Sequence, residues 1–248
     1  MCGRYSITSP PEAVRAFFGF VEETNLQPRY NVAPTQEVPA VRLGEDGKRH
    51  LVQLRWGLVP FWADDLSIGN RMINARSEKV ASSPAFRHAF SRRRCLIVAD
   101  GFYEWQPRAK GPKQPYRAVI SEGTPMGLAG LWESWREPES GEAVESCTII
   151  TTDANDLLAQ IHPRMPVIVP QEAFETWLDV SVDKQRALDL LQPFPSRLMR
   201  AYPVSRDVNK VGNDAPDLIE PVGEGIGQSD ADEKPASGSA EDDEPRLL

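Results

Sequence analysis

The hydrophobic residues of the chain lie in short runs separated by turn-forming residues, and this pattern predicts many short strands. Strands are expected at positions 38–43, 49–59, 95–99, 102–106, 116–120, 128–135, 146–152, 165–169 and 198–204. The sequence GEDGK joins the first two and is typical of a turn.

A smaller number of segments carry helix signals. Ser9 is a typical N-cap residue, Pro11 suits the first helical turn, and Val14, Phe17 and Phe18 follow at helical spacing. Further short helices are expected at positions 83–90, 153–161, 171–178 and 183–191. Strands outnumber helices and do not alternate regularly with them. The pattern predicts a single α+β domain with a mixed, largely antiparallel, barrel-like β-sheet flanked by short helices.

Composition changes near position 221. The chain has 248 residues, enough for one sizeable core. Positions 221–248 contain eight acidic and two basic residues with almost no large apolar ones, so we expect a disordered acidic tail after a domain at positions 2–220.

The distribution of charge matters more for partners than its sum. The chain carries a net charge of −8, of which −6 falls in positions 221–248, so the domain itself is close to neutral. A local basic face is therefore compatible with the composition. The segment RHAFSRRR, positions 87–94, is the densest candidate, and a solvated helix end explains it equally well.

The cysteines and histidines exclude some classes of site. Cys2, Cys95 and Cys147 are odd in number and far apart, and the three histidines do not cluster, so neither a disulfide framework nor a metal site is expected. Cys95 and Cys147 lie in apolar runs and are expected in the core. No apolar run approaches the roughly 18 residues of a membrane span, and the N-terminus lacks the pattern of a signal peptide. The expectation is a cytosolic protein.

Cys2 gains a special chemistry if Met1 is removed. Its free α-amine condenses with an aldehyde to an imine, and the adjacent thiol then closes a five-membered thiazolidine ring. The unperturbed α-amine and thiol titrate at roughly 8 and 8.5, so both are usable near neutral pH after modest tuning. Taken alone, Cys2 is more simply an incidental residue.

Three further polar residues are candidates for proton transfer or positioning. Asn74, in INARSE, either orients a reacting group or serves as a turn or cap residue. Glu104, in DGFYEWQ, shares a strand with aromatic residues, where its pKa is raised if it is buried, although an exposed strand glutamate is the simpler reading. His162, in IHPRMPVIV, is either structural or a proton shuttle.

Aromatic residues interleave with arginine and proline in WGLVPFW, FYEW and LWESW. Aromatic platforms combined with arginine suit single-stranded nucleic acid, because every base has a face that can stack. Most tryptophans nevertheless belong to cores, so we expect only one or two at the surface.

These segments together resemble a known family. MCGRYS, RYNVAPTQ, RWGLVPFWA, INARSE, RCLIVADGFYEW, IHPRMPVIV and VSRDVNKVGND occur in the order found in the SOS-response-associated peptidase (SRAP) family, which includes abasic-site-processing proteins of bacteria and animals. The resemblance covers about positions 2–220. Val98 replaces a proline that is common in the family.

The resemblance implies a mechanism and a set of residues. After Met1 is lost, by an aminopeptidase or by self-cleavage, Cys2 forms a thiazolidine crosslink with the opened sugar of an abasic site in single-stranded DNA. Glu104 manages protons, His162 assists, and Asn74 orients Cys2 and the sugar. The residues expected to bind DNA are Arg4, Arg76 and Arg164 for phosphates and Trp62 and Trp105 for bases.

The resemblance also implies that no cofactor or metal is needed and that the protein is a monomer. It implies a cytoplasmic location, at the bacterial nucleoid when bound to DNA, with unknown partners at the replication fork. Two alternatives stay open: a thiol peptidase built on Cys2, Asn74, Glu104 and His162, and a reader that binds single-stranded or modified DNA without a covalent bond.

Overall fold

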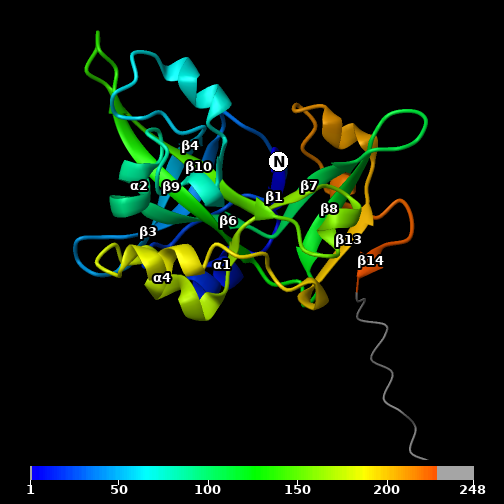
Figure 1. Cartoon of the computed structure of the whole chain (residues 1–248). Helices are drawn as coiled ribbons and strands as arrows, with labels where there is room; N and C mark the ends of the chain where they lie inside the picture. Colours follow the sequence, from blue (N-terminus) through cyan, green and yellow to red (C-terminus); the bar gives the residue numbers. More distant parts are fainter. Residues whose placement is uncertain (1, 228–248) are drawn as a thin grey trace, which may run out of the picture.

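Five strands close a barrel that holds most of the hydrophobic core (Figure 1). In the computed structural model, which describes residues 2–227, the barrel order is β4, β3, β6, β9, β10 and back to β4. Every contact in this ring is antiparallel except that between β10 and β4, which is parallel. The barrel strands are β3 (Glu37–Leu43), β4 (Arg49–Trp56), β6 (Arg94–Ala99), β9 (Met126–Arg136) and β10 (Ala143–Asp153).

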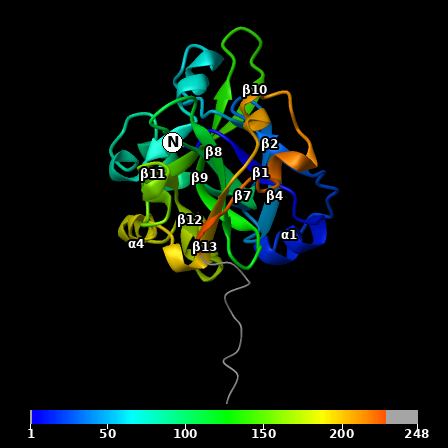
Figure 2. The same cartoon turned by 90° about the vertical axis from the view of Figure 1, so that its right-hand side faces the viewer.

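A second, antiparallel sheet lies beside the barrel, and Figure 2 shows the molecule from its side. Its order is β14 (Ile226–Gly227), β13 (Met199–Pro203), β8 (Gln114–Ile120), β7 (Gly101–Gln106), β1 (Tyr5–Ile7) and β2 (Arg29–Val32). Only Asp100 separates the barrel strand β6 from β7. The two sheets are therefore joined at a short connection beside β1.

Short helices and single-turn segments complete the fold. The α-helices are α1 (Pro11–Phe18), α2 (Arg87–Arg92), α3 (Phe174–Leu178) and α4 (Lys184–Asp189), and the 3-10 helices are η1 (Leu66–Arg71), η2 (Ser77–Lys79), η3 (Leu158–Gln160), η4 (Gln171–Ala173), η5 (Ser196–Leu198), η6 (Arg206–Asn209) and η7 (Pro216–Ile219). Three small strands, β5 (Asn74–Arg76), β11 (Arg164–Pro166) and β12 (Ile168–Val169), join the barrel sheet. The expected α+β class, with a largely antiparallel barrel-like sheet and short helices, is confirmed.

The first helix shows how local sequence sets its ends. Pro11 occupies the first helical turn, and Gly19 ends the helix in a left-handed conformation (φ 69°) that glycine adopts without steric cost. Val14 and Phe18 are buried on its inner face, where the Phe18 ring stacks on Phe174. The expected cap, Ser9, binds Asp100 instead.

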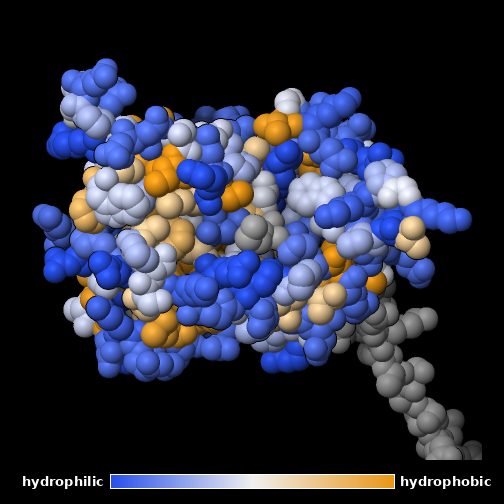
Figure 3. Space-filling view, turned by 45° about the horizontal axis from the view of Figure 1, so that its top comes forward, coloured by the Kyte–Doolittle hydropathy of each residue, from blue (hydrophilic) through white to orange (hydrophobic). Residues whose placement is uncertain are grey.

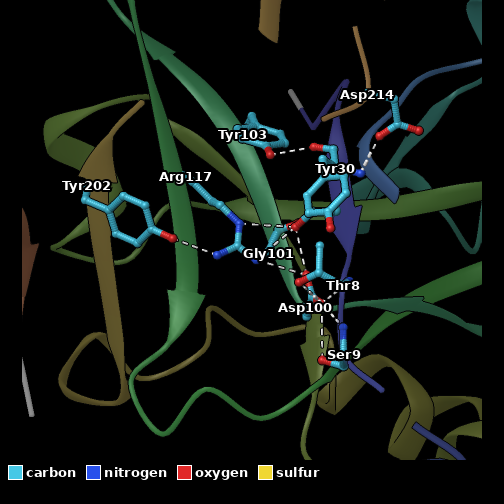
Figure 4. Close-up of polar contacts among 10 residues, drawn as sticks. Thr8, Ser9, Tyr30, Asp100, Gly101, Tyr103, Arg117, Tyr202 and Asp214 are labelled. Carbon is cyan, nitrogen blue, oxygen red and sulfur yellow. Dashed lines mark hydrogen bonds and ion pairs between the residues drawn. The ribbon is translucent and has the colours of Figure 1, made fainter. Parts of the chain in front are cut away.

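Asp100 and Arg117 form a buried ion pair between the strands that surround the N-terminal segment (Figure 4). The two side chains are only 6% and 9% exposed, and Arg117 Nη2 lies 3.0 Å from Asp100 Oδ1. Ser6 and Thr8 donate hydrogen bonds to Asp100, and Arg117 also donates to Ser6 Oγ. Burial raises the pKa of Asp100, but Arg117 and these hydrogen bonds outweigh it, so the pKa is lowered.

Several expectations from the sequence need correction. Positions 153–161 do not form one helix: β10 continues to Asp153, and only Leu158–Gln160 makes a 3-10 turn. The Asn155 side chain accepts from Leu158 N and donates to Phe194 O, and such side-chain bonds compete with a regular helix. The structured chain also extends past 220, because β14 pairs with β13. The rest of the expected tail, 228–248, lies outside the described residues.

The arginine-rich segment at 87–94 is not one solvated face. Arg94 is 2% exposed, and its guanidinium donates to three backbone carbonyls, including those of Phe90 and Trp177. Arg93 pairs with the buried Glu133. Arg87 and Arg92 are the arginines of this segment that are exposed to a partner. Cys95 and Cys147 are fully buried, as expected of core residues.

Candidate active site

Cys2 lies where the N-terminal segment enters β1, between the barrel and the second sheet (Figure 1). It is 0% exposed, and its thiol faces the backbone oxygen of Arg4 at 3.9 Å. Burial raises the pKa of the thiol well above its ordinary value, and the nearby carboxyl of Glu104 raises it further. The sulfur is therefore a neutral thiol in the folded protein at neutral pH.

Asn74 reaches Cys2 from the barrel. It is the first residue of β5, which runs parallel to β10 with Asn74 opposite Ile149. Its Nδ2 donates to the backbone oxygen of Cys2 at 2.8 Å. Its Oδ1 is buried and accepts no hydrogen bond within residues 2–227. The amide thus holds the Cys2 backbone and keeps a second polar atom at the site.

Glu104 lies on β7, beside the strand that Cys2 precedes. Glu104 is only 3% exposed, so it is not an exposed strand glutamate. Burial raises its pKa to about 7, although the positive charge of Lys113 is among the influences that lower it. A carboxyl with this pKa exchanges a proton readily near neutral pH.

His162 stands next to Glu104, between η3 and β11. Its Nδ1 lies 3.8 Å from Glu104 Oε2 and accepts a hydrogen bond from Arg164 N at 3.1 Å. Partial burial lowers the pKa of the imidazole, so the ring is predominantly neutral at pH 7. The structure thus brings Cys2, Asn74, Glu104 and His162 into one region.

The three arginines expected to bind DNA have different surroundings. Arg4 is half-buried and donates to Asn31 Oδ1 and Val208 O, which ties it to the segment after β13. Arg164 is held by Glu78 and Asp153. Arg76 is exposed at the end of β5, and no carboxylate within residues 2–227 pairs with it.

The two tryptophans expected at the DNA also differ. Trp62 is 48% exposed, next to Phe61, which is 55% exposed. Trp105 is partly buried, and its Nε1 donates to Asn209 Oδ1 at 2.7 Å. Of the other tryptophans, Trp56, Trp135 and Trp177 are buried in the core. Trp62 is therefore the better placed to meet a base.

Two residues near the site escaped the sequence reasoning. Lys113 lies on the turn between β7 and β8 and acts electrostatically on both Glu104 and His162. Gln106 donates through Nε2 to Gln160 O at 2.8 Å and so links the end of β7 to the segment before His162. The glycine and proline of PRAKGPK, between the expected strands at 102–106 and 116–120, are a turn signal that could have pointed to Lys113, whereas nothing local marked Gln106.

One face of the molecule is mainly polar. In the view of Figure 3, hydrophilic side chains cover most of the face and hydrophobic ones gather only in small, separate patches.

Within residues 2–227 there is no group of three or more His, Cys, Asp or Glu side chains arranged to hold a metal ion. No helix in that part of the chain is long and apolar enough to cross a bilayer.

Comparison with known proteins gives a consistent result. The family model described as SOS response associated peptidase (SRAP) matches residues 1–211. Abasic site processing protein YoqW of Bacillus subtilis (strain 168) is 41% identical over 224 residues, covering 89% of this chain and 99% of that protein. Abasic site processing protein HMCES of Gallus gallus is 32% identical over 238 residues, covering 84% of this chain and 70% of that protein.

A solved structure shares the fold. A protein from Bacteroides thetaiotaomicron superposes with a TM-score of 0.80 at 27% sequence identity, covering 89% of this chain and 99% of that one.

Proposed function

The chain belongs to the SOS response associated peptidase (SRAP) family, and we propose that it processes abasic sites in single-stranded DNA by forming a covalent bond through Cys2. One observation carries the proposal: a buried carboxyl with a pKa of about 7, Glu104, lies close enough to Cys2 to raise the pKa of its thiol. A proton-exchanging group beside an N-terminal aminothiol is what condensation with an aldehyde requires.

The reaction proceeds in two bond-forming steps. An abasic deoxyribose opens to its C1′ aldehyde, and the α-amine of Cys2, freed by loss of Met1, adds to C1′. Water leaves, and an imine forms. The thiol sulfur then adds to the same carbon while its proton passes to the nitrogen, which closes the thiazolidine. One aldehyde and one aminothiol thus give one thiazolidine and one water.

The surrounding residues divide the remaining work. Glu104 delivers a proton to the departing hydroxyl and removes one from the thiol, and its pKa of about 7 suits both directions. His162, predominantly neutral and 3.8 Å from Glu104, relays protons at the sugar. Asn74 fixes the Cys2 backbone through its 2.8 Å hydrogen bond.

The protonated thiol favours this function over a thiol peptidase. A cysteine peptidase attacks with a thiolate, and such cysteines have a lowered pKa. The pKa of the Cys2 thiol is raised instead, first by burial and then by Glu104. The amine is therefore the first nucleophile, and the thiol acts second. Single-stranded DNA is the proposed partner, bound through Arg4, Arg76 and Arg164 and through Trp62 and Trp105.

The test is a denaturing gel of the protein incubated with a single-stranded oligonucleotide that contains one abasic site. Wild type is expected to give a slow band that survives denaturation, and Cys2→Ala is expected to give none. Both Cys2→Ala and Cys2→Ser keep the α-amine once Met1 is lost and lack only the thiol, so borohydride is expected to trap an imine in each. Intact mass of the wild type, measured first, is expected to lack Met1. A wild-type protein without Met1 that binds the oligonucleotide but never forms the band contradicts the proposal.

A further inference from the structure

A basic turn connects β7 and β8 at the edge of the site. Residues 107–113 have the sequence PRAKGPK, which contains three cations and no acidic residue. All seven residues are exposed. The ladder below the turn pairs Gln106 with Gln114, so Lys113 is the last turn residue before the paired strand.

Gln106 fixes the base of this turn relative to the catalytic segment. Its Nε2 donates to Gln160 O, two positions before His162, and Gln106 itself lies two positions after Glu104. One hydrogen bond thus connects the strand that carries the carboxyl with the segment that carries the imidazole. The turn that ends with Lys113 stands at this junction.

The charge of Lys113 reaches both catalytic groups. Burial is the largest influence, and it raises the pKa of Glu104 and lowers that of His162; the Lys113 ammonium is a smaller influence that lowers the pKa of each. Lys110, on the same turn, is not among the main influences on either group. Lys113 is therefore the turn cation that faces the site.

Lys113 is also available to an anion. Its side chain is exposed, and no carboxylate within residues 2–227 forms an ion pair with it. Arg108 differs, because its Nη2 donates to Gln114 Oε1 at 2.7 Å. Arg164 differs as well, since Glu78 and Asp153 already occupy its guanidinium. An unpaired ammonium on a short turn is suited to bind a phosphate as a point charge.

The geometry points to Lys113 as a further substrate-contacting residue, which binds the DNA phosphate next to the abasic sugar at the Glu104 and His162 end of the site. The inference rests on the proposed function, because it takes single-stranded DNA as the occupant. Through this contact Lys113 sets the position of the sugar relative to the carboxyl and the imidazole, a role that the other turn cations do not share.

The experiment measures non-covalent binding of the full chain to a single-stranded oligonucleotide containing tetrahydrofuran, an abasic analogue without an aldehyde. Affinity is recorded against salt concentration for wild type, Lys113→Gln, Lys113→Arg and the control Lys110→Gln. For Lys113→Gln, the slope of log affinity against log salt is expected to fall by about 0.7, the loss of one phosphate contact on single-stranded DNA. Its affinity at low salt is expected to fall roughly 3- to 10-fold. Lys113→Arg is expected to keep the slope, and Lys110→Gln is expected to lose much less affinity than Lys113→Gln.

The outcomes separate this inference from the proposed function. An unchanged slope and affinity for Lys113→Gln overturn the contact, even where wild type crosslinks to a natural abasic site. Equal losses in Lys113→Gln and Lys110→Gln also overturn it, because the turn then acts only as a diffuse charge. If wild type binds the tetrahydrofuran oligonucleotide but does not crosslink to an oligonucleotide with a natural abasic site, the covalent step is disproved. The slope of the salt dependence still decides the role of Lys113.

Discussion

Asn74 donates a hydrogen bond through Nδ2 to the backbone oxygen of Cys2 at 2.8 Å, although 72 positions separate the two residues. The barrel sheet carries Asn74 on β5, whereas Cys2 precedes β1 of the second sheet. The bond therefore sets the position of the reactive residue relative to the barrel. Glu104 approaches Cys2 from β7 of the second sheet. The geometry of the site therefore depends on the position of the two sheets relative to each other.

We expect Asn74→Ala to slow crosslinking far more than it weakens the fold. Loss of one hydrogen bond lowers the free energy of unfolding by about 1 kcal/mol. Misplacement of the Cys2 backbone by even an ångström is expected to cost on the order of 100-fold in rate. The rate is measured at saturating oligonucleotide, and stability by urea unfolding.

Gln171→Ala serves as the matched control. Its Nε2 also donates to a backbone oxygen, that of Phe17, at 2.9 Å, but from η4. This variant is expected to lose stability and to crosslink at the wild-type rate. If both variants slow the reaction equally, Asn74 acts only through general stability and the positioning role is wrong.

Local patterns in the sequence predict the strands that carry this site, whereas the set of site residues follows from the resemblance to the SRAP family. Alternation along FYEW placed Glu104 on a strand, and the structure shows it buried on β7. Apolar runs likewise predicted the barrel strands that contain Cys95 and Cys147. Such patterns report which residues avoid water, and this information is local.

The elements that the sequence does not predict depend on contacts between distant segments. β5 is three residues long, and its partner β10 lies about 75 positions away in a parallel ladder. The sequence therefore contains no turn and no alternation that would predict this pairing. The expected helix at 153–161 failed for the same reason, since Asp153 pairs with Arg164 across β10 and β11. Tertiary pairing outweighs helix propensity there.

Glu104 is expected to make stability depend on pH. Burial raises its pKa to about 7 from an ordinary value of 4.5, so between these values the folded protein keeps a proton that the unfolded chain releases. The contribution of the protonated carboxyl to the free energy of unfolding is therefore fully present below about pH 4.5 and is lost as pH rises through about 7. The loss is on the order of a few kcal/mol.

Glu104→Gln tests this directly, because the amide stays neutral at every pH. Urea unfolding at pH 5 and pH 8 is expected to show that the variant gains stability relative to wild type as pH rises. The same variant is expected to bind single-stranded DNA and to crosslink slowly. A stability difference that does not change with pH means that Glu104 titrates in the folded protein as it does in the unfolded chain.

The buried pair of Asp100 and Arg117 is expected to be coupled energetically. Asp100→Asn leaves the Arg117 charge buried without its partner, which lowers the free energy of unfolding by about 3–5 kcal/mol. The double variant with Arg117→Gln removes both charges and is expected to lose less than the sum of the single losses. Chemical unfolding of the four proteins gives the coupling energy, and strictly additive losses would falsify the coupling.

Arg76 is expected to contribute more to DNA affinity than Arg164, although both are proposed phosphate contacts. Arg164 Nη1 lies 2.8 Å from Asp153 Oδ1, its Nη2 donates to Thr151 O at 2.7 Å, and Glu78 also pairs with the guanidinium. A phosphate must displace these partners before it binds Arg164, and that exchange offsets much of the gain. Arg76 has no ion pair within residues 2–227 to give up.

The comparison uses Arg76→Gln and Arg164→Gln with the tetrahydrofuran oligonucleotide at several salt concentrations. At low salt, Arg76→Gln is expected to weaken binding roughly 5- to 10-fold and Arg164→Gln about 2-fold. Glu78→Gln tests the opposite change. It removes one ion-pair partner of Arg164, so DNA binding is expected to become tighter. If Glu78→Gln weakens binding instead, the carboxylate orients Arg164 for the phosphate rather than competing with it.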